Sequence, residues 1–240
     1  MLHKTRGIVF RSIKYSNTSI ISTIYTELFG LQTYIINGAR SAKSKKAPLF
    51  QPATILDLVV YRKENKNIQH IKEMKVDVLY RTLPLQVVRS SVALFIIETL
   101  LKCIHEEEAN PALFVFIVDI LTYLDECKTV PALLPQYFLL ALSKHLGFYP
   151  HDKFTEATPY FNMREGHFAE KEALQYSLPA SMSKLFSELK EINRDELEAI
   201  HLPYPQRKEL LDMLVIFYTL HVENFKRLKS LEVLEEVFRN

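Results

Sequence analysis

The sequence predicts an α+β protein in which a small five-stranded β-barrel, residues 1–82, is followed by an all-α helical region, residues 83–240. Residues 4–81 are rich in Ile, Val, Thr and Tyr, whereas apolar residues recur at helical spacing after Pro84. Charge follows the same division, because residues 1–80 hold 13 Lys+Arg against 5 Asp+Glu and the remainder hold 17 against 23. A basic first third and a mildly acidic remainder predict two units with different partners.

Five strand-like segments succeed one another in the first unit, and none of them has a helical pattern. They are residues 5–15, 18–26, 31–39, 53–63 and 68–80. Turn-like breaks separate them at 16–17, 27–30 and 64–67, and a basic loop lies between the third and the fourth. Five strands in about 80 residues are typical of the OB-fold, a Greek-key barrel that binds oligonucleotides and oligosaccharides.

The helical region begins after "RTLPLQ", where Pro84 suits the first turn of a helix. We expect helices at 87–104, at 111–126, from Pro131 and Pro135 to Gly147, and at 179–190, 193–200, 206–226 and 229–238. The 206–226 helix is apolar almost all round, which predicts a central place in a bundle. Residues 148–169 are expected to be irregular.

The motifs of common enzyme classes are absent from the sequence. The five glycines build neither GxGxxG nor GxxxxGK[ST], and there is no GxSxG. "HEEEA" at 105–109 lacks the second histidine of a zincin helix, and His145, His151 and His167 lack carboxylates in matching register. His221 lies in an apolar helix and is interpreted as a core residue. We therefore expect no enzyme, no cofactor and no metal.

Cysteine usage and hydropathy predict a soluble, cytoplasmic protein. Cys103 and Cys127 are far apart and form no CxxC, which favours a chain without disulfides or a cysteine zinc site. The first residues contain no apolar signal region. The two most apolar runs carry Glu98 and Asp119 and fall short of the roughly 20 apolar residues of a membrane span.

The basic loop "NGARSAKSKKAPLFQP", residues 37–52, is the strongest functional signal. Its cations have no acidic neighbour in the loop, and its small residues would let a phosphate backbone come close. The predicted DNA contacts are Arg40, Lys43, Lys45 and Lys46 of the loop, with Arg11, Lys14, Arg62 and Lys63 on the strands. Aromatics beside cations suit single-strand binding, and Tyr34 is the predicted stacking residue among Tyr25, Tyr34, Phe50 and Tyr61.

Three segments together resemble the amino-terminal OB-domain of the RecO family of recombination mediators. They are "TRGIVFRSIKYSNTSIISTIYTELFG", "GARSAKSKKAPLFQP" and "LVVYRKENKNIQHIKEMKV". The helical remainder agrees through "LGFYP" at 146–150, "FNMREGHF" at 161–168 and the closing "FKRLKSLEVLEEVF". The resemblance rests on their order and spacing and covers nearly the whole chain.

The resemblance implies a non-catalytic protein of DNA repair and recombination that associates with the nucleoid during repair. Family members bind single- and double-stranded DNA, anneal complementary strands, and work with RecR to load RecA onto strands coated by single-stranded DNA-binding protein. Gly38, Ala39, Arg40, Ser44, Gln51 and Pro52 match the family pattern. The resemblance therefore assigns DNA contact to Arg40 and the neighbouring lysines.

The resemblance also implies that the helical domain docks the acidic, hydrophobic C-terminal tail of the coating protein. Such a tail needs cations around an apolar groove. The candidates by composition are Arg207, Lys208, Lys226 and Arg227.

The chain departs from the family pattern in one respect. Many members carry a four-cysteine zinc ribbon after the segment that matches "LGFYP", whereas residues 148–169 contain no cysteine. We expect no zinc here, and expect packing of Phe154, Tyr160, Phe161 and Phe168 to hold this segment instead.

Two other classes of function stay open at the level of sequence. OB-folds also bind peptides, so the chain is compatible with a non-catalytic protein-interaction module in which the basic loop is only solvated. A stacking surface does not by itself distinguish RNA from DNA, so an RNA-binding factor is the third possibility.

Overall fold

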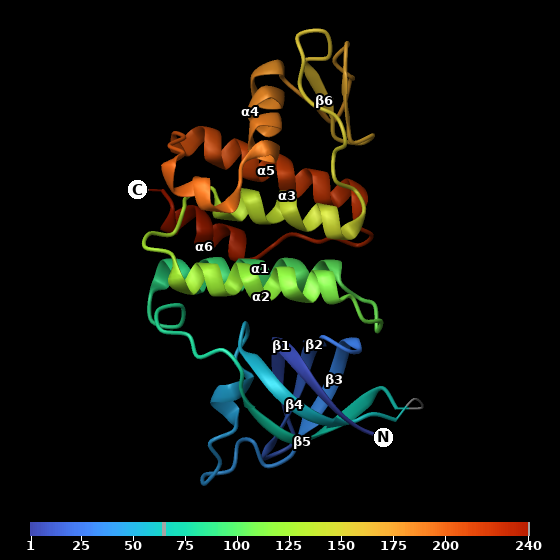
Figure 1. Cartoon of the computed structure of the whole chain (residues 1–240), viewed down its shortest axis with the longest axis vertical. Coiled ribbons are helices and arrows are strands. Elements are labelled where there is room, and N and C mark those ends of the chain that lie inside the picture. The colour runs from blue at the N-terminus through green and yellow to red at the C-terminus, as the bar shows by residue number, and fades with distance from the viewer. Residues whose placement is uncertain (64–65, 240) are drawn as a thin grey trace. The chain divides into compact units, whose positions relative to one another are not determined.

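The computed structural model describes residues 1–63 and 66–239, and the chain folds as two compact units, Met1–Cys127 and Lys128–Asn240 (Figure 1). The first unit contains the barrel and two helices, and the second contains the remaining helices and a small sheet. The division of the chain at residues 82 and 83 stays a prediction. The predicted break at 64–67 lies partly outside the described residues.

The barrel is built from the five predicted strands. They are β1 Leu2–Tyr15, β2 Ser19–Thr26, β3 Gly30–Ile36, β4 Ile55–Tyr61 and β5 Ile68–Val76, with a 3₁₀ turn η1 at Ala47–Phe50. The strands close in the order β1-β2-β3-β5-β4; the β3–β5 pair is parallel, and the other four described pairs are antiparallel. Because the five-stranded barrel precedes the helices, the predicted OB-fold class is confirmed.

Alternation along the strands separates the core from the outer surface of the barrel. In β3, Gln32, Tyr34 and Ile36 are buried, whereas the residues between them are half-buried. The core is made of side chains that lie far apart in sequence, among them Val9, Ile20, Ile24, Phe29, Tyr34, Phe50, Leu56, Leu58 and Val60. The β-branched strands therefore form a barrel filled by side chains.

Two helices complete the first unit, α1 Val87–Cys103 and α2 Pro111–Glu126. Asn110 caps α2, because its side chain accepts a hydrogen bond from the Leu113 N–H at 3.0 Å, and Pro111 opens the first turn. An aromatic stack joins barrel to helix, with Phe10 and Tyr25 centred 5.7 Å apart and Tyr25 and Phe114 6.1 Å apart. The α1–α2 connection also touches β3, where the Leu31 N–H donates to the Glu106 carbonyl at 3.0 Å.

Asp125, near the end of α2, holds the segment that leaves the barrel. Its carboxylate accepts hydrogen bonds from the backbone N–H groups of Arg81 at 2.9 Å, Thr82 at 2.8 Å and Leu83 at 2.7 Å. Burial acts to raise the pKa of Asp125, but these hydrogen bonds outweigh it and hold that pKa below its ordinary value. Arg89 lies nearby, buried, and donates to the Cys127 carbonyl at 2.7 Å.

The second unit contains the remaining elements. They are α3 Leu134–Leu146, β6 Tyr160–Asn162, β7 His167–Ala169, β8 Ser177–Leu178, α4 Ala180–Glu191, the 3₁₀ segment η2 Arg194–Ala199, α5 Tyr204–His221 and α6 Ser230–Val237. The expectation of an irregular segment at 148–169 was wrong in part, because β6 and β7 lie within it and form a sheet in the order β7-β6-β8. Strands of two or three residues are too short to leave a periodic pattern.

The predicted helix 206–226 differs in both length and burial. It runs from Tyr204 to His221, and Val222 is already extended, with φ −111° and ψ 120°. Leu210, Leu214 and Phe217 are buried, while Ile216 is 40% exposed. The helix therefore buries one face and leaves Ile216 exposed, which is less complete burial than the predicted central place in a bundle would give.

Aromatic packing supports the small sheet. Phe161 and Phe168 are buried, and the Phe161 ring lies 5.0 Å from Phe168, 4.5 Å from Phe186 and 5.8 Å from Phe217. Phe154 and Tyr160 are half-buried. His221 stacks on the Phe148 ring at 5.1 Å, and its Nε2 lies 2.8 Å from the Met163 carbonyl.

The described residues contain neither a candidate membrane-spanning helix nor a candidate metal cluster. Over residues 1–63 and 66–239, none of the helices combines the length and apolar character that a bilayer span needs. Over the same residues, no group of three or more His, Cys, Asp or Glu side chains is arranged to hold a metal ion. Cys103 is buried, Cys127 is half-buried, and both are free thiols.

Candidate nucleic-acid interface

The basic loop is tied to the turn between β1 and β2. The Arg40 N–H donates to the Thr18 carbonyl at 2.8 Å, and Ala39 is buried beneath the loop, 1% exposed. Gly38 has φ +67°, which allows the chain to turn sharply at the end of β3. The loop backbone is thus anchored, while the side chains of Arg40, Lys43, Lys45 and Lys46 are all exposed.

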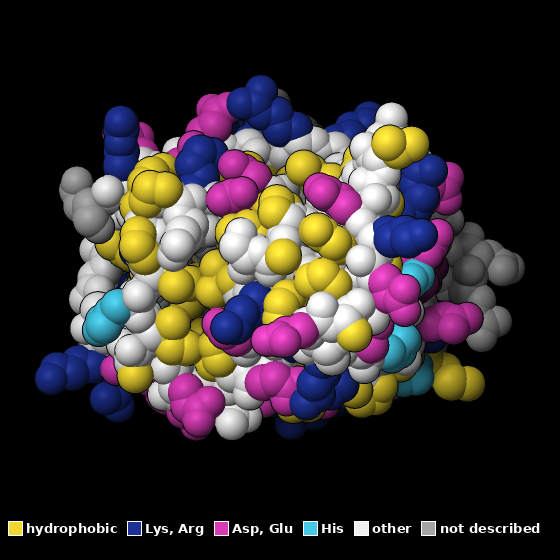
Figure 2. Space-filling view, turned by 90° about the horizontal axis from the view of Figure 1, so that it is seen from above, with side chains coloured by type: hydrophobic (Ala, Val, Ile, Leu, Met, Phe, Trp, Pro, Cys, Tyr) yellow, Lys and Arg dark blue, Asp and Glu magenta, His cyan; other side chains and the backbone are white. Residues whose placement is uncertain are grey.

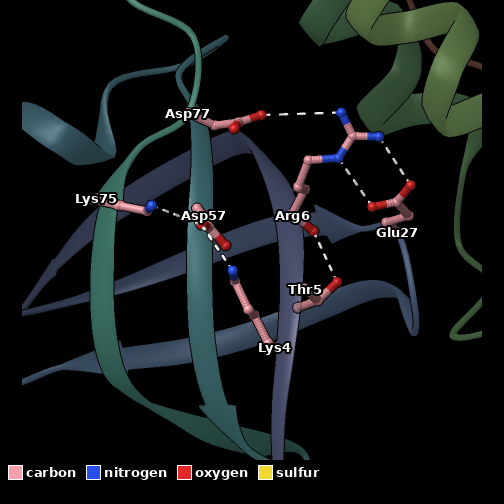
Figure 3. A network of polar contacts seen from close by, with 7 residues as sticks. All are labelled: Lys4, Thr5, Arg6, Glu27, Asp57, Lys75 and Asp77. Carbon is pink, nitrogen blue, oxygen red and sulfur yellow. Dashed lines mark hydrogen bonds and ion pairs between the residues drawn. The ribbon is translucent and has the colours of Figure 1, made fainter.

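Other cations of the barrel are already paired with carboxylates (Figure 3). Arg6 donates twice to Glu27, at 3.0 and 2.9 Å, and this hydrogen bonding lowers the pKa of Glu27. The Asp57 carboxylate lies 3.2 Å from the Lys75 Nζ and 3.6 Å from the Lys4 Nζ, as Figure 3 shows. The hydrogen bond from Lys75 lowers the pKa of Asp57 and burial raises it by less, so this pKa lies below its ordinary value. These cations have their counter-charges within the fold.

The predicted contact residues differ from this paired set. Within residues 1–63 and 66–239 we find no ion pair to a carboxylate for Arg11, Lys14, Arg40, Lys43, Lys45, Lys46 or Lys63. The excess charge of the barrel is therefore concentrated on side chains that face solvent and have no ion pair with a carboxylate in the described part of the chain. This arrangement suits an external polyanion.

The choice of Tyr34 as a stacking residue was wrong. Tyr34 is 1% exposed in the barrel core, and its burial raises the pKa of its hydroxyl. Tyr25 and Phe50 are buried as well, so they do not offer a free ring face. Tyr61 is 45% exposed, and the sequence-based choice missed Tyr15, which is 50% exposed at the end of β1. The missed signal is the spacing by two of Arg11, Ile13 and Tyr15, which places them on one strand face.

The register of the barrel aligns one residue from each strand on the outer surface. Ile13 pairs with Ile21, Ile21 with Ile35, Ile35 with His70, and His70 with Tyr61. We call this row the outward stripe. Ile13 is 45% exposed, Ile21 and Ile35 are half-buried, and His70 is exposed. Paired residues point to the same side of a sheet, so the three isoleucines form an apolar floor that continues through His70 to the Tyr61 ring.

Cations lie at both ends of the outward stripe. At the β1 end, Arg11 lies on the same strand face as Ile13, and the basic loop is bonded to the neighbouring turn. At the β4 end, Arg62 and Lys63 follow Tyr61. The Arg62 guanidinium lies 4.4 Å above the Phe29 ring and is half-buried, while Lys63 is exposed. Along the curved wall of the closed barrel, four strand spacings lie between the two ends, a surface path of about 19 Å.

The cations predicted to dock a partner lie in the second unit and are engaged within it. Arg207 and Lys208 line a pocket with Tyr204, Leu211, Leu234 and Phe238. Lys208 Nζ lies 2.6 Å from Glu235 and 3.0 Å from Asp212, and Arg207 donates to the Leu202 and Phe238 carbonyls.

The other two docking candidates are not among the residues that line this pocket. These are Lys226 and Arg227, and Arg227 pairs with Glu232. Seen from the side of α4 and β6, acidic and basic side chains are intermixed around hydrophobic ones (Figure 2). The structure therefore places two of the four predicted cations together, around an apolar pocket.

Comparison with known proteins identifies relatives over the whole chain. The family described as "Recombination protein O N terminal" matches residues 1–78, and "Recombination protein O C terminal" matches residues 85–232. A protein of Flavobacterium psychrophilum named "DNA repair protein RecO" is 37% identical over 237 residues, 98% of each chain. Proteins of the same name are 33% identical in Bacteroides fragilis, over 99% of this chain and 100% of the relative, and 30% identical in Chlorobium phaeobacteroides, over 99% of each chain.

Proposed function

The chain belongs to the recombination protein O family, and on that premise we propose that it is a DNA repair protein that binds DNA through its barrel. Two relatives that carry the name "DNA repair protein RecO" match at 33–37% identity over nearly the full length. The first unit supplies the DNA-binding surface, and the second supplies surfaces for protein partners.

One observation carries the proposal: the outward stripe connects two groups of cations. Exposed rings at Tyr15 and Tyr61 offer stacking faces, and the isoleucines between them form an apolar floor for bases. Arg11 and the basic loop at one end, and Lys63 at the other, track the phosphates. A surface path of about 19 Å suits the OB-fold site size of roughly four nucleotides or more.

Several finer functions belong to the same proposal. The protein binds single- and double-stranded DNA and anneals complementary strands, because a cationic surface lowers the repulsion between two backbones without any catalytic group. With RecR as a partner it helps to load RecA onto strands coated by single-stranded DNA-binding protein. The pocket lined by Arg207 and Lys208 is our candidate for the acidic C-terminal tail of the coating protein, and a tail bound there exchanges with Glu235 as the partner of Lys208.

Fluorescence anisotropy with a labelled single-stranded oligonucleotide, repeated across a salt series, tests the proposal. The logarithm of the binding constant should fall against the logarithm of salt with a slope of about −0.7 per phosphate contact. Lys43→Gln with Lys45→Gln should flatten the slope by about 1.4. The control is Lys4→Gln with Lys75→Gln, two lysines that share the Asp57 carboxylate, and it should flatten the slope less than the loop variant does.

Stacking is tested separately from phosphate contact. Tyr15→Ala should weaken binding by about 1–3 kcal/mol while the salt slope stays the same. If the wild-type protein does not bind at low salt, or if both double variants flatten the slope equally, the barrel is not a specific DNA surface. A protein-interaction role would then be favoured, and tighter binding of an RNA oligonucleotide of the same sequence would favour an RNA-binding factor.

A further inference from the structure

Gln69 is a buried polar residue on a strand whose neighbours face outward. It is the second residue of β5 and is 5% exposed, whereas Ile68 and His70 on either side are exposed. Its partner across the parallel pair is Tyr34, another buried residue. A buried amide needs hydrogen-bond partners, since an unpaired one destabilises the fold.

Among residues 1–63 and 66–239, the hydrogen-bond partners of the Gln69 side chain are Lys63 and Lys66, between β4 and β5. Its Nε2 donates to the Lys63 carbonyl at 2.8 Å and to the Lys66 carbonyl at 2.6 Å, and its Oε1 accepts from the Lys63 N–H at 3.0 Å. The Lys66 N–H in turn donates to the Lys63 carbonyl at 3.2 Å. One side chain thus fixes the backbone of both lysines, while both lysine side chains are exposed.

Arg62, the neighbouring residue, is held independently. Its guanidinium stacks on Phe29 at 4.4 Å, and its N–H donates to the Met1 carbonyl at 3.0 Å. Phe29 is buried and in edge contact with His3 at 5.1 Å. The start of the connection is therefore supported without Gln69, so the contribution of Gln69 is confined to Lys63 and Lys66.

We propose that Gln69 is a positioning residue for DNA binding, which holds Lys63 and Lys66 ready to contact phosphates at the β4 end of the outward stripe. The inference rests on the proposed function, because it assigns this role only if the barrel binds DNA. Two lysines whose backbone is already ordered lose less freedom on binding than two lysines on a free loop. Gln69 itself does not touch DNA.

A double-mutant cycle on the full chain separates positioning from general stability. The variants are Gln69→Leu, the pair Lys63→Gln with Lys66→Gln, and their combination, each measured by the anisotropy salt series. The control is Gln136→Leu in the second unit, where another glutamine, 2% exposed, donates to a backbone carbonyl, that of Arg207, at 2.7 Å. This control shows how the loss of a buried glutamine changes DNA binding when the glutamine holds none of the predicted barrel contacts.

We expect Gln69→Leu to flatten the salt slope by up to about 1.4, as the double lysine variant does, and to weaken binding about tenfold. In the combined variant, the losses in binding free energy from the Gln69 and lysine substitutions should not add. Without Gln69 the lysines no longer contact phosphate, so replacing them has no further effect. Gln136→Leu should leave the slope unchanged. An unchanged slope in Gln69→Leu, or strictly additive effects, would overturn the proposal.

Failure of the inference is distinguishable from failure of the proposed function. If wild-type protein does not bind the oligonucleotide, the proposed function itself is wrong. If wild type binds and the lysine pair matters but Gln69→Leu behaves like Gln136→Leu, only the positioning role is wrong.

Hydrogen exchange of the wild-type protein provides a measurement that does not depend on the variant folding. The Lys63 amide, bonded to Gln69, should exchange more slowly than the amide of Lys43, an exposed residue of the basic loop. Equal exchange rates for the Lys63 and Lys43 amides in the free protein would overturn the claim that Gln69 holds the Lys63 backbone in place.

Discussion

Gly30 is a position where a single methyl group should separate the α1–α2 connection from the barrel. Its φ is +60°, and a Cβ built there would lie 2.7 Å from the Glu106 carbonyl oxygen and 2.8 Å from the Glu108 nitrogen. Contacts with backbone at these distances are not relieved by rotation of a side chain. Gly30→Ala therefore forces the 106–108 segment away from β3.

The chain offers a matched control at Gly38, whose φ is +67° and around which a Cβ would meet nothing within 4 Å. Both substitutions force an alanine into the left-handed region, which destabilises the folded state by about 1–2 kcal/mol. Alanine also makes the unfolded chain less flexible, and this offsets about 0.4–1 kcal/mol of that destabilisation. Gly30→Ala also breaks the hydrogen bond from Leu31 to Glu106, about 1 kcal/mol, and overpacks the contact by about 1–3 kcal/mol. We expect Gly30→Ala to destabilise the first unit by about 2–4 kcal/mol more than Gly38→Ala.

Urea unfolding followed by far-ultraviolet circular dichroism measures this difference, and it suits a chain without tryptophan. Both glycines lie in the first unit, so the same transition is compared. Gly30→Ala should unfold at a clearly lower urea concentration than Gly38→Ala. Equal midpoints would refute the reasoning, because they would mean that the α1–α2 connection does not press on β3.

Two further predictions concern the carboxylate of Asp125 and the pocket of the second unit. Asp125→Asn should destabilise the first unit by about 1–3 kcal/mol at pH 7. Because the folded pKa of Asp125 is lowered, its contribution is present above the unfolded value of about 3.9 and is lost as pH falls through the folded pKa. The gap in urea midpoint between wild type and variant should thus narrow below about pH 4, and a gap that is constant from pH 7 to 3 would contradict this. In the pocket, Glu235→Gln should strengthen binding of a labelled acidic, hydrophobic peptide several-fold, because it frees Lys208 from its ion pair. Glu232→Gln is the control, since Glu232 does not line the pocket. If both variants change peptide binding equally, the pocket is not the docking site.

Local chemistry made the order of elements predictable. Strand segments rich in β-branched residues became β1 to β5, and Asn110 with Pro111 marked the start of α2. The end of α5 was missed, because "VENFK" after His221 contains neither Gly nor Pro and its stop signal is the weaker one of Asn224, which takes φ 57°. The strands β6, β7 and β8 were missed because they are only two or three residues long and depend on packing around Phe161.

The candidate site shows the same division between local and non-local information. The sequence shows that the basic loop contains no acidic residue. It does not show that Arg6 is paired with a carboxylate and that Lys43 has no such pair among the described residues, because both are simply cations in the sequence. Only the fold brings Glu27 to Arg6 across 21 residues, and leaves Lys43 without an ion pair to any described carboxylate. Tyr34 and Tyr15 were likewise indistinguishable as exposed aromatics until the strand register assigned their faces.

The sequence by itself determined the barrel-then-helices order, the family and the uncompensated loop, because these depend on residue types and on neighbours along the chain. The tertiary structure decided which cations are paired, which rings are exposed, and that Gln69 holds Lys63 and Lys66. The physical reason is that burial and ion pairing depend on residues brought together by strand register and barrel closure. Tyr25, for example, stacks on Phe10 and on the helix residue Phe114. These contacts join residues far apart in sequence, so no local sequence pattern predicts them.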